Sequence, residues 1–211
     1  LLPFLEEDEH LREGFFRQLE LIFYAGAALP QDLWERLVAV SKQAVGRAVP
    51  MVSAWGSTET APMATAVHWH IDRAGVIGLP VPGTDIKMVP NGSKMELRVR
   101  GPNVTPGYLK QPDLTVAAFD DEGFYKIGDA GCLADPDDPT QGLVFDGRVA
   151  EDFKLTTGTW VNSGALRLAA LTAASPVLQD VVVAGHDRDF VTLLAWLSIG
   201  GSRAFLGNEG I

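Results

Sequence analysis

The sequence MVSAWGSTET, residues 51–60, joins a short apolar run to a polar motif. Residues 51–54 have the pattern of a short buried strand, which would place residues 55–60 at its carboxyl end. In open α/β sheets, ligands bind at the carboxyl ends of strands. The motif offers an aromatic face, hydroxyl groups and a carboxylate, so the sequence predicts a binding site at this point.

The residues before this motif predict alternating strand and helix. Residues 21–24 form an apolar run that ends before Gly26, which is typical of a buried parallel strand. Pro30 then suits the beginning of a helix, and Gly46 suits its end. We therefore expect residues 1–72 to be part of an α/β domain.

Residues 73–148 predict strands and turns instead. The runs at 85–89 and 95–100 flank Asn91 and Gly92, and Asn-Gly between two such runs is a strong hairpin signal. Apolar and charged residues alternate over 95–100, so one face of that strand should be buried. We expect a β-rich, barrel-like subdomain here.

Residues 149–211 mix both patterns and predict the beginning of a small α+β C-terminal domain. The last part of this region, rich in glycine, is expected to be irregular. The predicted elements are, in order, a hairpin over residues 151–161, a helix capped by Asn162 or Ser163 and ended by Pro176, and apolar strands at 181–183 and 191–197.

Composition excludes several classes of protein. The chain has 211 residues, 46% of them hydrophobic, which is enough for a substantial core. Its formal net charge of −10 disfavours nonspecific binding to nucleic acid or anionic membranes. One cysteine, Cys132, excludes an intramolecular disulfide and fits a reducing cytoplasm. No stretch is long and apolar enough to span a bilayer, and nothing in the sequence indicates an oligomeric state.

Four motifs occur in a fixed order along the chain. They are FYAGAALP at residues 23–30, WGSTE at 55–59, YKIGD at 125–129 and GRVAEDFK at 147–154. Together they resemble the adenylate-forming superfamily, which includes acyl-CoA synthetases and other AMP-binding enzymes. Four positions depart from the family pattern: Trp55 replaces the usual Tyr, Ile127 replaces Thr, Glu151 replaces Asp, and Phe153 replaces Ile.

The resemblance implies an acyl-CoA synthetase, an acid–thiol ligase that uses ATP, Mg²⁺ and coenzyme A. Such an enzyme converts a small carboxylic acid to an acyl-adenylate and then transfers the acyl group to coenzyme A. Residues 74–84 and 151–161 are also similar to the feruloyl-CoA synthetase branch, which implies ferulate or another hydroxycinnamate as the acid. A fatty acid is the alternative substrate.

The resemblance also implies roles for the nucleotide-site residues. Trp55 would stack on adenine or form a wall of the acyl pocket, Thr58 would bind the α-phosphate, and Glu59 would hold Mg²⁺. Asp129 would accept the ribose hydroxyls, and Arg148 would bind ribose or phosphate. All of these residues except Arg148 also have a structural alternative: a core tryptophan, a helix cap, a first-turn acid and a turn aspartate.

Further roles concern the acid, coenzyme A and the domain boundary. Glu151 would be the hinge about which the small domain rotates, or a solvated acid in a turn. Small residues on the loop after the first strand would leave room for an aromatic acid, or serve packing alone. The remaining assignments are Gly26, Ala27, Ala28 and Gly56 for cofactor binding, Tyr24, Gly26, Pro62 and Met63 for the substrate pocket, and Lys154 and Gly158 for coenzyme A.

Two family motifs have no counterpart in these residues: the phosphate-binding loop before Tyr24 and the lysine near the family's C-terminus. We therefore expect an internal segment of a longer enzyme that is inactive alone. The alternative from another class is an adenylate-binding module without catalysis.

Overall fold

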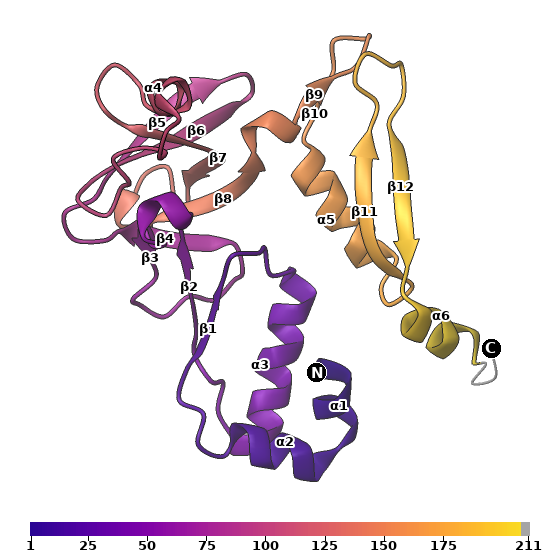
Figure 1. Ribbon diagram of the computed structural model, residues 1–211. Coiled ribbons are helices and arrows are strands. Elements are labelled where there is room, and N and C mark those ends of the chain that lie inside the picture. Colours follow the sequence, from indigo (N-terminus) through magenta and orange to yellow (C-terminus); the bar gives the residue numbers. More distant parts are fainter. Residues whose placement is uncertain (208–211) are drawn as a thin grey trace.

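A computed structural model describes residues 1–207 of the chain, and an eight-stranded sheet dominates it (Figure 1). The strand order is β1-β2-β3-β4-β8-β7-β6-β5. Its strands are β1 (Ile22–Ala25), β2 (Met51–Trp55), β3 (Thr65–Ala66), β4 (Val76–Pro80), β5 (Asp85–Asn91), β6 (Lys94–Arg100), β7 (Tyr125–Leu133) and β8 (Leu143–Arg148).

The N-terminal part has the strand–helix–strand order that the sequence predicted. Strands β1 and β2 are parallel, and Ala25 lies opposite Ala54. Helix α3 (Gln31–Val45) connects them and ends at Gly46, whose left-handed φ of 71° lets its N–H reach Lys42 O. Helices α1 (Leu2–Glu7) and α2 (Glu9–Phe16) pack on α3. Their shared core contains Leu5, Phe16, Val40 and Val49.

The β-rich part is an open sheet. The predicted hairpin is confirmed: β5 and β6 pair from Asp85 opposite Arg100 to Asn91 opposite Lys94. Within residues 1–207, β1 and β5 are the two ends of the strand order and do not pair, so the sheet is not closed into a barrel. Long-range pairing explains the difference, because β4 joins β8 and makes this region continuous with β1 and β2. The α/β-plus-β fold class is confirmed.

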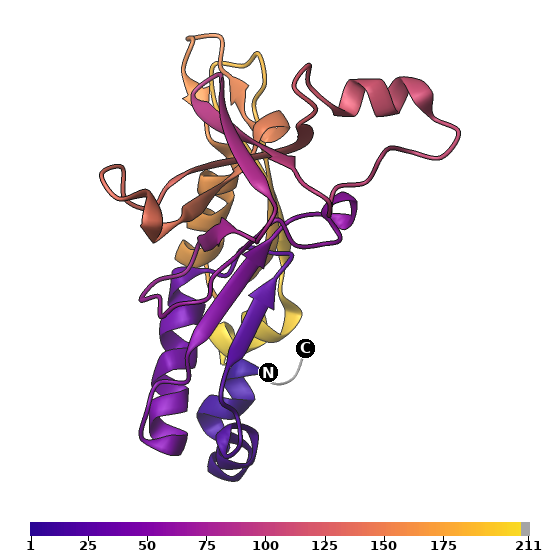
Figure 2. The ribbon, with the colours of Figure 1, turned by 90° about the vertical axis from the view of Figure 1, so that its left-hand side faces the viewer.

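The C-terminal elements lie beyond β8 (Figures 1 and 2). Asn162 caps α5, as predicted, and its side chain accepts a hydrogen bond from Ala165 N. The predicted irregular end instead contains α6, because Ser198 caps that helix by accepting from Gly201 N despite the glycines. The elements are β9 (Phe153–Lys154), β10 (Trp160–Val161), α5 (Ser163–Ala173), β11 (Leu178–Ala184), β12 (Thr192–Leu197) and α6 (Ile199–Leu206).

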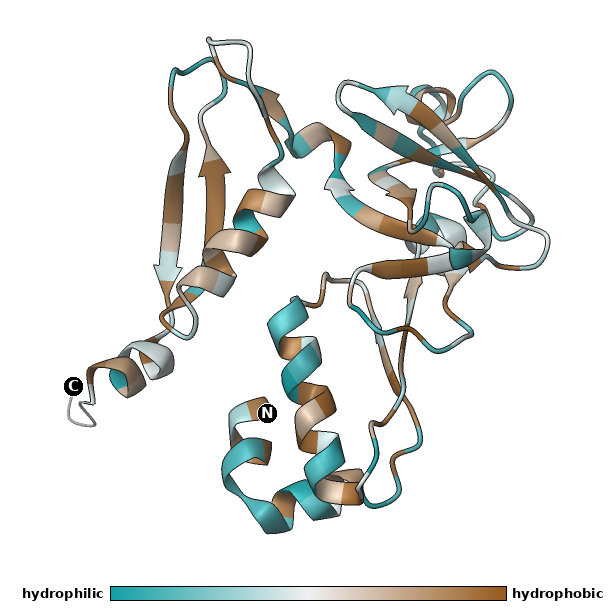
Figure 3. Ribbon diagram, turned by 180° about the vertical axis from the view of Figure 1, so that it is seen from behind, coloured by the Kyte–Doolittle hydropathy of each residue, from teal (hydrophilic) through white to brown (hydrophobic). Residues whose placement is uncertain are grey.

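Apolar residues are distributed unevenly over these parts. The main core joins the end of β2 to β6 and β7 and includes Trp55, Leu97, Tyr125 and Ile127. By contrast, every residue of β12 is exposed, and Figure 3 shows apolar segments along β11 and β12. Among the described residues, no helix combines the length and apolarity needed to cross a membrane.

The short elements complete the chain. Helix α4 (Pro112–Ala118) lies between β6 and β7. Three 3₁₀ turns, η1 (Thr58–Thr60), η2 (Pro139–Gln141) and η3 (Val149–Glu151), connect strands. Turn η1 carries the Thr-Glu motif at the carboxyl end of β2, where the sequence placed it.

Candidate active site

Asp129 is a buried carboxylate that is held from two sides. It lies on β7 and is 7% exposed. Trp55 Nε1 donates a 2.8 Å hydrogen bond to its Oδ2, and Arg148 Nε lies 3.1 Å from its Oδ1. Burial raises the pKa of Asp129, while Trp55 and Arg148 oppose that rise. Each carboxylate oxygen keeps a further acceptor position for a ligand hydroxyl.

Arg148 is poised to bind a second group. It ends β8 directly opposite Asp129 in the strand register. Its side chain is 59% exposed, so the guanidinium reaches solvent although one nitrogen pairs with the buried carboxylate. A guanidinium has five N–H donors, and those not used by Asp129 are available to a phosphate or hydroxyl.

Glu59 is held by a tyrosine pair. Tyr108 OH donates a 3.0 Å hydrogen bond to Glu59 Oε1, and the hydroxyls of Tyr108 and Tyr125 are 3.3 Å apart. Hydrogen bonds from its own backbone, Ser57 and the two tyrosines lower the pKa of Glu59 against a smaller opposing effect of burial. Glu59 is therefore ionised at neutral pH.

The Thr-Glu turn is fixed by a compact set of hydrogen bonds. Thr60 Oγ1 accepts from Ser57 N at 2.9 Å. Asn103 Nδ2 donates to Thr60 O at 3.1 Å and to Met63 O at 2.8 Å. Gly56 cannot carry a side chain, because a Cβ there would lie 2.1 Å from Pro62 O. The turn exposes Thr58 and holds Glu59 beside it.

The donor set fits Mg²⁺ held jointly by protein and nucleotide. Within residues 1–207, no group of three or more His, Cys, Asp or Glu side chains could hold a metal ion alone. Glu59 supplies one ionised carboxylate. Mg²⁺ commonly takes one or two carboxylates and fills its shell with water and phosphate oxygens.

The predicted acyl-pocket residues lie beside the Thr-Glu turn. Gly26 follows β1, which is parallel to β2, so residues 26–28 emerge at the same edge of the sheet as residues 55–60. Ala27, Ala28, Pro62 and Met63 are all exposed. Burial raises the pKa of Tyr24 on the preceding strand. A substrate pocket here stays a prediction.

The surroundings of Trp55 are those of a core tryptophan, the structural alternative to adenine stacking. It is 7% exposed and packs in the main hydrophobic cluster, and its indole N–H is used by Asp129. Its observed contact is therefore to the carboxylate. Adenine stacking by Trp55 stays a prediction.

The predicted coenzyme A and hinge residues lie on the other side of β8. Glu151 ends η3 and is exposed. Lys154 Nζ lies 4.9 Å from the centre of the Trp160 ring, and Gly158 occupies the β9–β10 turn with φ of 83°. Among the described residues, no hydrogen bond or ion pair joins these three residues to Glu59 or Asp129, and their roles stay predictions.

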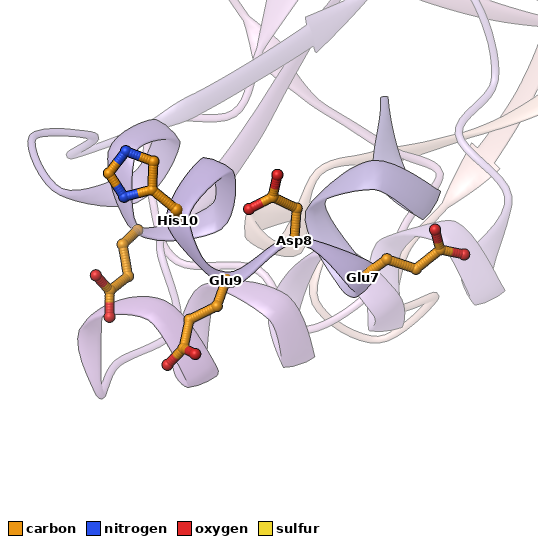
Figure 4. Close-up of a pocket in the computed structure, with 5 residues that line it drawn as sticks. Glu7, Asp8, Glu9 and His10 are labelled. Carbon is orange, nitrogen blue, oxygen red and sulfur yellow. The ribbon is translucent and has the colours of Figure 1, made fainter.

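Two surface pockets lie away from the candidate site. One, of about 660 Å³, lies at the junction of α1 and α2 and is lined by Glu7, Asp8, Glu9, His10 and Glu13 (Figure 4). The other, of about 470 Å³, is lined by residues 69–73 and the segment before β8. Neither lining includes Trp55, Glu59, Asp129 or Arg148, so the predicted nucleotide contacts lie outside these pockets.

Comparison with known proteins identifies the family. The family model described as AMP-binding enzyme matches residues 4–109. The chain belongs to the AMP-binding enzyme family. An Arabidopsis thaliana relative, a probable chloroplastic acyl-activating enzyme, is 31% identical over 160 residues, which are 69% of this chain and 22% of that protein. An Escherichia coli long-chain-fatty-acid–CoA ligase is 34% identical over 135 residues, which are 54% of this chain and 23% of that protein.

Solved structures of AMP-binding enzymes have a similar fold. A malonyl-CoA ligase with methylmalonyl-CoA and AMP bound has a TM-score of 0.56 and 31% identity, over 93% of this chain and 41% of that one. The A domain of a carboxylic acid reductase from Segniliparus rugosus has a TM-score of 0.67 and 20% identity, over 96% of this chain and 35% of that one. The chain thus spans well under half the length of these proteins.

Tyr108 and Asn103 are site residues that the sequence analysis missed. Pro106 and Gly107 mark a turn, but no local pattern links the next residue to Glu59, which is 49 positions earlier. Asn103 likewise reaches back 43 positions to Thr60. Both contacts depend on long-range folding, and the sequence carries no signal for them.

Proposed function

We propose that the protein is the central part of an ATP-dependent acid–thiol ligase. The carboxylate of a small organic acid attacks the α-phosphorus of ATP, and pyrophosphate leaves. The coenzyme A thiol then attacks the acyl carbonyl, and AMP leaves. Membership of the AMP-binding enzyme family supports this proposal, as do acyl-activating relatives in plants and bacteria.

One observation carries the proposal: Asp129 and Glu59 are carboxylates held in two different ways, and we propose that they belong to one nucleotide site. Asp129 is buried and held by Trp55 and Arg148, whereas Glu59 is partly exposed and held by Tyr108. Tyr125, at the beginning of β7, connects them, because it contacts Tyr108 and lies on the same strand as Asp129.

The two carboxylates suit two parts of a nucleotide. Asp129 accepts hydrogen bonds, so it would orient the ribose diol. Glu59 is ionised and would hold Mg²⁺. When bound, Mg²⁺ would neutralise part of the phosphate charge. Thr58 and Arg148 are exposed donors that would orient the α-phosphate. The residues thus act by positioning and charge stabilisation, without a protein nucleophile.

Ferulate or another hydroxycinnamate is the first proposed acid. The similarity of residues 74–84 and 151–161 to feruloyl-CoA synthetases supports it, together with the small residues after β1. A long-chain fatty acid is the second candidate, supported by the 34% identity to the bacterial fatty-acid–CoA ligase. Coenzyme A would contact Lys154 and Gly158 after rotation about Glu151.

The test is thioester formation by the complete protein with ATP, Mg²⁺, coenzyme A and either ferulate or palmitate. AMP release with ferulate and not palmitate supports the first substrate, and the reverse supports the second. A third result would favour the adenylate-binding module without catalysis. In that case the protein binds AMP but releases neither AMP nor pyrophosphate with any acid from either class. The proposal also predicts that residues 1–211 alone do not turn over.

A further inference from the structure

A buried ion pair joins the C-terminal unit, defined here as residues 152–207, to the eight-stranded sheet. Lys94 Nζ, at the beginning of β6, lies 2.9 Å from Asp152 Oδ2. The two side chains are only 4% and 6% exposed. Charged side chains are rarely buried to this extent unless they are paired.

Each partner is fixed to its own side of the boundary. Lys94 Nζ donates a 2.5 Å hydrogen bond to Asp146 O on β8, which ties it to the sheet. Asp152 Oδ1 accepts a 3.1 Å hydrogen bond from Ser163 N at the beginning of α5, which ties it to the C-terminal unit. The ion pair therefore connects two separately anchored bodies.

Other contacts also cross this boundary. Asn162 Nδ2 donates to Asp146 Oδ1 at 3.0 Å. Trp160 on β10 packs on the β5–β6 turn, where a Cβ on Gly92 would come within 3.2 Å of its ring. Figure 2 shows the tip of the β5–β6 hairpin near the β9–β10 turn. Domains in one chain normally move relative to one another unless their interface is large and hydrophobic.

We propose that Lys94 and Asp152 form a latch that holds the C-terminal unit in the orientation seen here. While the latch is closed, each charge has its partner. If Lys94 becomes neutral, Asp152 is left as a buried charge that loses its 2.9 Å ion pair. If Asp152 becomes neutral, Lys94 keeps only the more distant carboxylate of Asp146, at 3.9 Å. Both states are unfavourable, because a buried charge has lost its close partner. Movement of the C-terminal unit away from the sheet relieves this cost, because it returns the remaining charge to water.

The latch also bears on the proposed two-step reaction, and this consequence rests on the proposed function. Asp152 directly follows Glu151, the proposed hinge. Rotation there would carry Asp152 and Ser163 away from Lys94. Lys94 would then be a positioning residue, whose loss shifts the balance between adenylate formation and thioester formation instead of lowering both equally.

The distance test requires no ligand. In the complete protein, spin labels on Cys132 of β7, the one cysteine of residues 1–211, and on Leu194→Cys of β12 report the separation of the two bodies by double electron–electron resonance. Any cysteine outside these residues is first replaced by serine. Both sites are exposed. With the latch intact we expect one narrow distance distribution. Lys94→Met and Asp152→Asn should each add a second population at a different distance.

Controls separate the latch from general destabilisation. Lys87→Met removes another lysine ion pair of the same hairpin, to Asp120 and Glu122, and should leave the distribution unchanged. The double variant Lys94→Met/Asp152→Leu leaves no unpaired charge, so its second population should be smaller than in either single variant. If Lys94→Met does not fold, the nearly isosteric Asp152→Asn still gives the decisive comparison.

Two results would overturn the latch: single variants with the parental distance distribution, or a double variant whose second population equals the sum of the two singles. The reaction is then measured in the complete protein as ATP–pyrophosphate exchange and thioester formation. A change of at least threefold in their ratio supports the positioning role, and an unchanged ratio contradicts it. If the proposed function is wrong, the parent protein will catalyse neither reaction. The distance measurement will still test the latch in that case.

Discussion

Trp55 Nε1 donates a 2.8 Å hydrogen bond to Asp129 Oδ2, although 74 positions separate the two residues in the chain. The bond links the end of β2 to the middle of β7 inside the main core. The carboxylate is thereby fixed before any ligand arrives, which is the condition for precise recognition of a vicinal diol.

Trp55→Phe should destabilise the fold and weaken nucleotide binding together. The substitution removes the indole N–H and leaves a buried carboxylate oxygen without that partner, at a cost of about 1–3 kcal/mol. Urea unfolding measures the first effect and calorimetric titration with AMP measures the second. The matched control is Trp196→Phe, because Trp196 on β12 is 48% exposed and should change neither quantity. A Trp55→Phe protein with parental stability would contradict the account.

The stability of the Asp129→Asn variant, relative to that of the parent protein, should increase as the pH rises. Burial raises the pKa of Asp129 in the folded protein above its ordinary value of 3.8. When the pH is well below 3.8, Asp129 is therefore protonated in both the folded and the unfolded protein. As the pH rises through the folded pKa, the parent loses stability because ionisation is easier in the unfolded state. Asparagine removes this loss.

The measurement is the free energy of unfolding of Asp129→Asn minus that of the parent, from about pH 3 to about pH 7, a range that spans aspartate titration. We expect this difference to grow in favour of the variant. A constant difference, or one that grows in favour of the parent, would contradict the stated origin of the pKa rise.

Tyr108→Phe should impair the reaction through Glu59. The variant removes one hydrogen bond to the carboxylate and should raise the pKa of Glu59 toward its ordinary range. Hydrogen bonds to charged groups contribute about 1.5–3 kcal/mol, and the lower value suits a partly exposed group. We expect roughly a tenfold lower kcat/KM for ATP, since about 1.4 kcal/mol is tenfold, and a higher Mg²⁺ requirement. If the Mg²⁺ dependence of the reaction is unchanged, Tyr108 does not influence metal binding, which would contradict this prediction.

Asn103→Ala should loosen the Thr-Glu turn. The variant leaves the carbonyls of Thr60 and Met63 without their side-chain donor. We expect a loss of about 1–3 kcal/mol in stability and faster hydrogen exchange at residues 58–64, while exchange in β11 and β12 is unchanged. Uniformly faster exchange across the whole chain would indicate a global effect and contradict a local role for Asn103.

The elements that local sequence signals determine were predicted well. Pro30 and Gly46 bracket α3, Asn91 and Gly92 form the turn of the β5–β6 hairpin, and Asn162 caps α5. Helix α6 was missed, because Gly200 and Gly201 lower helix propensity and the Ser198 cap that compensates for them is a single residue.

Features that depend on distant residues could not be predicted in the same way. The open sheet follows from the pairing of β4 with β8, which no local pattern specifies. The sequence placed Glu59 and Asp129 in one site, but it did not indicate the tyrosine pair that connects them. Nor did it show that Lys94 and Asp152 would meet across 58 positions, counted from their residue numbers.

The most direct measurement of the central claim compares the binding of AMP and 2′,3′-dideoxy-AMP to the complete protein and to its Asp129→Asn variant. If Asp129 accepts the ribose hydroxyls, the parent should bind AMP at least roughly tenfold more tightly than the dideoxy analogue, because that analogue leaves a buried acceptor unpaired. The variant should lose most of this preference. Equal affinities in the parent, or the full preference retained in the variant, would contradict the assignment of Asp129 as the ribose-binding residue.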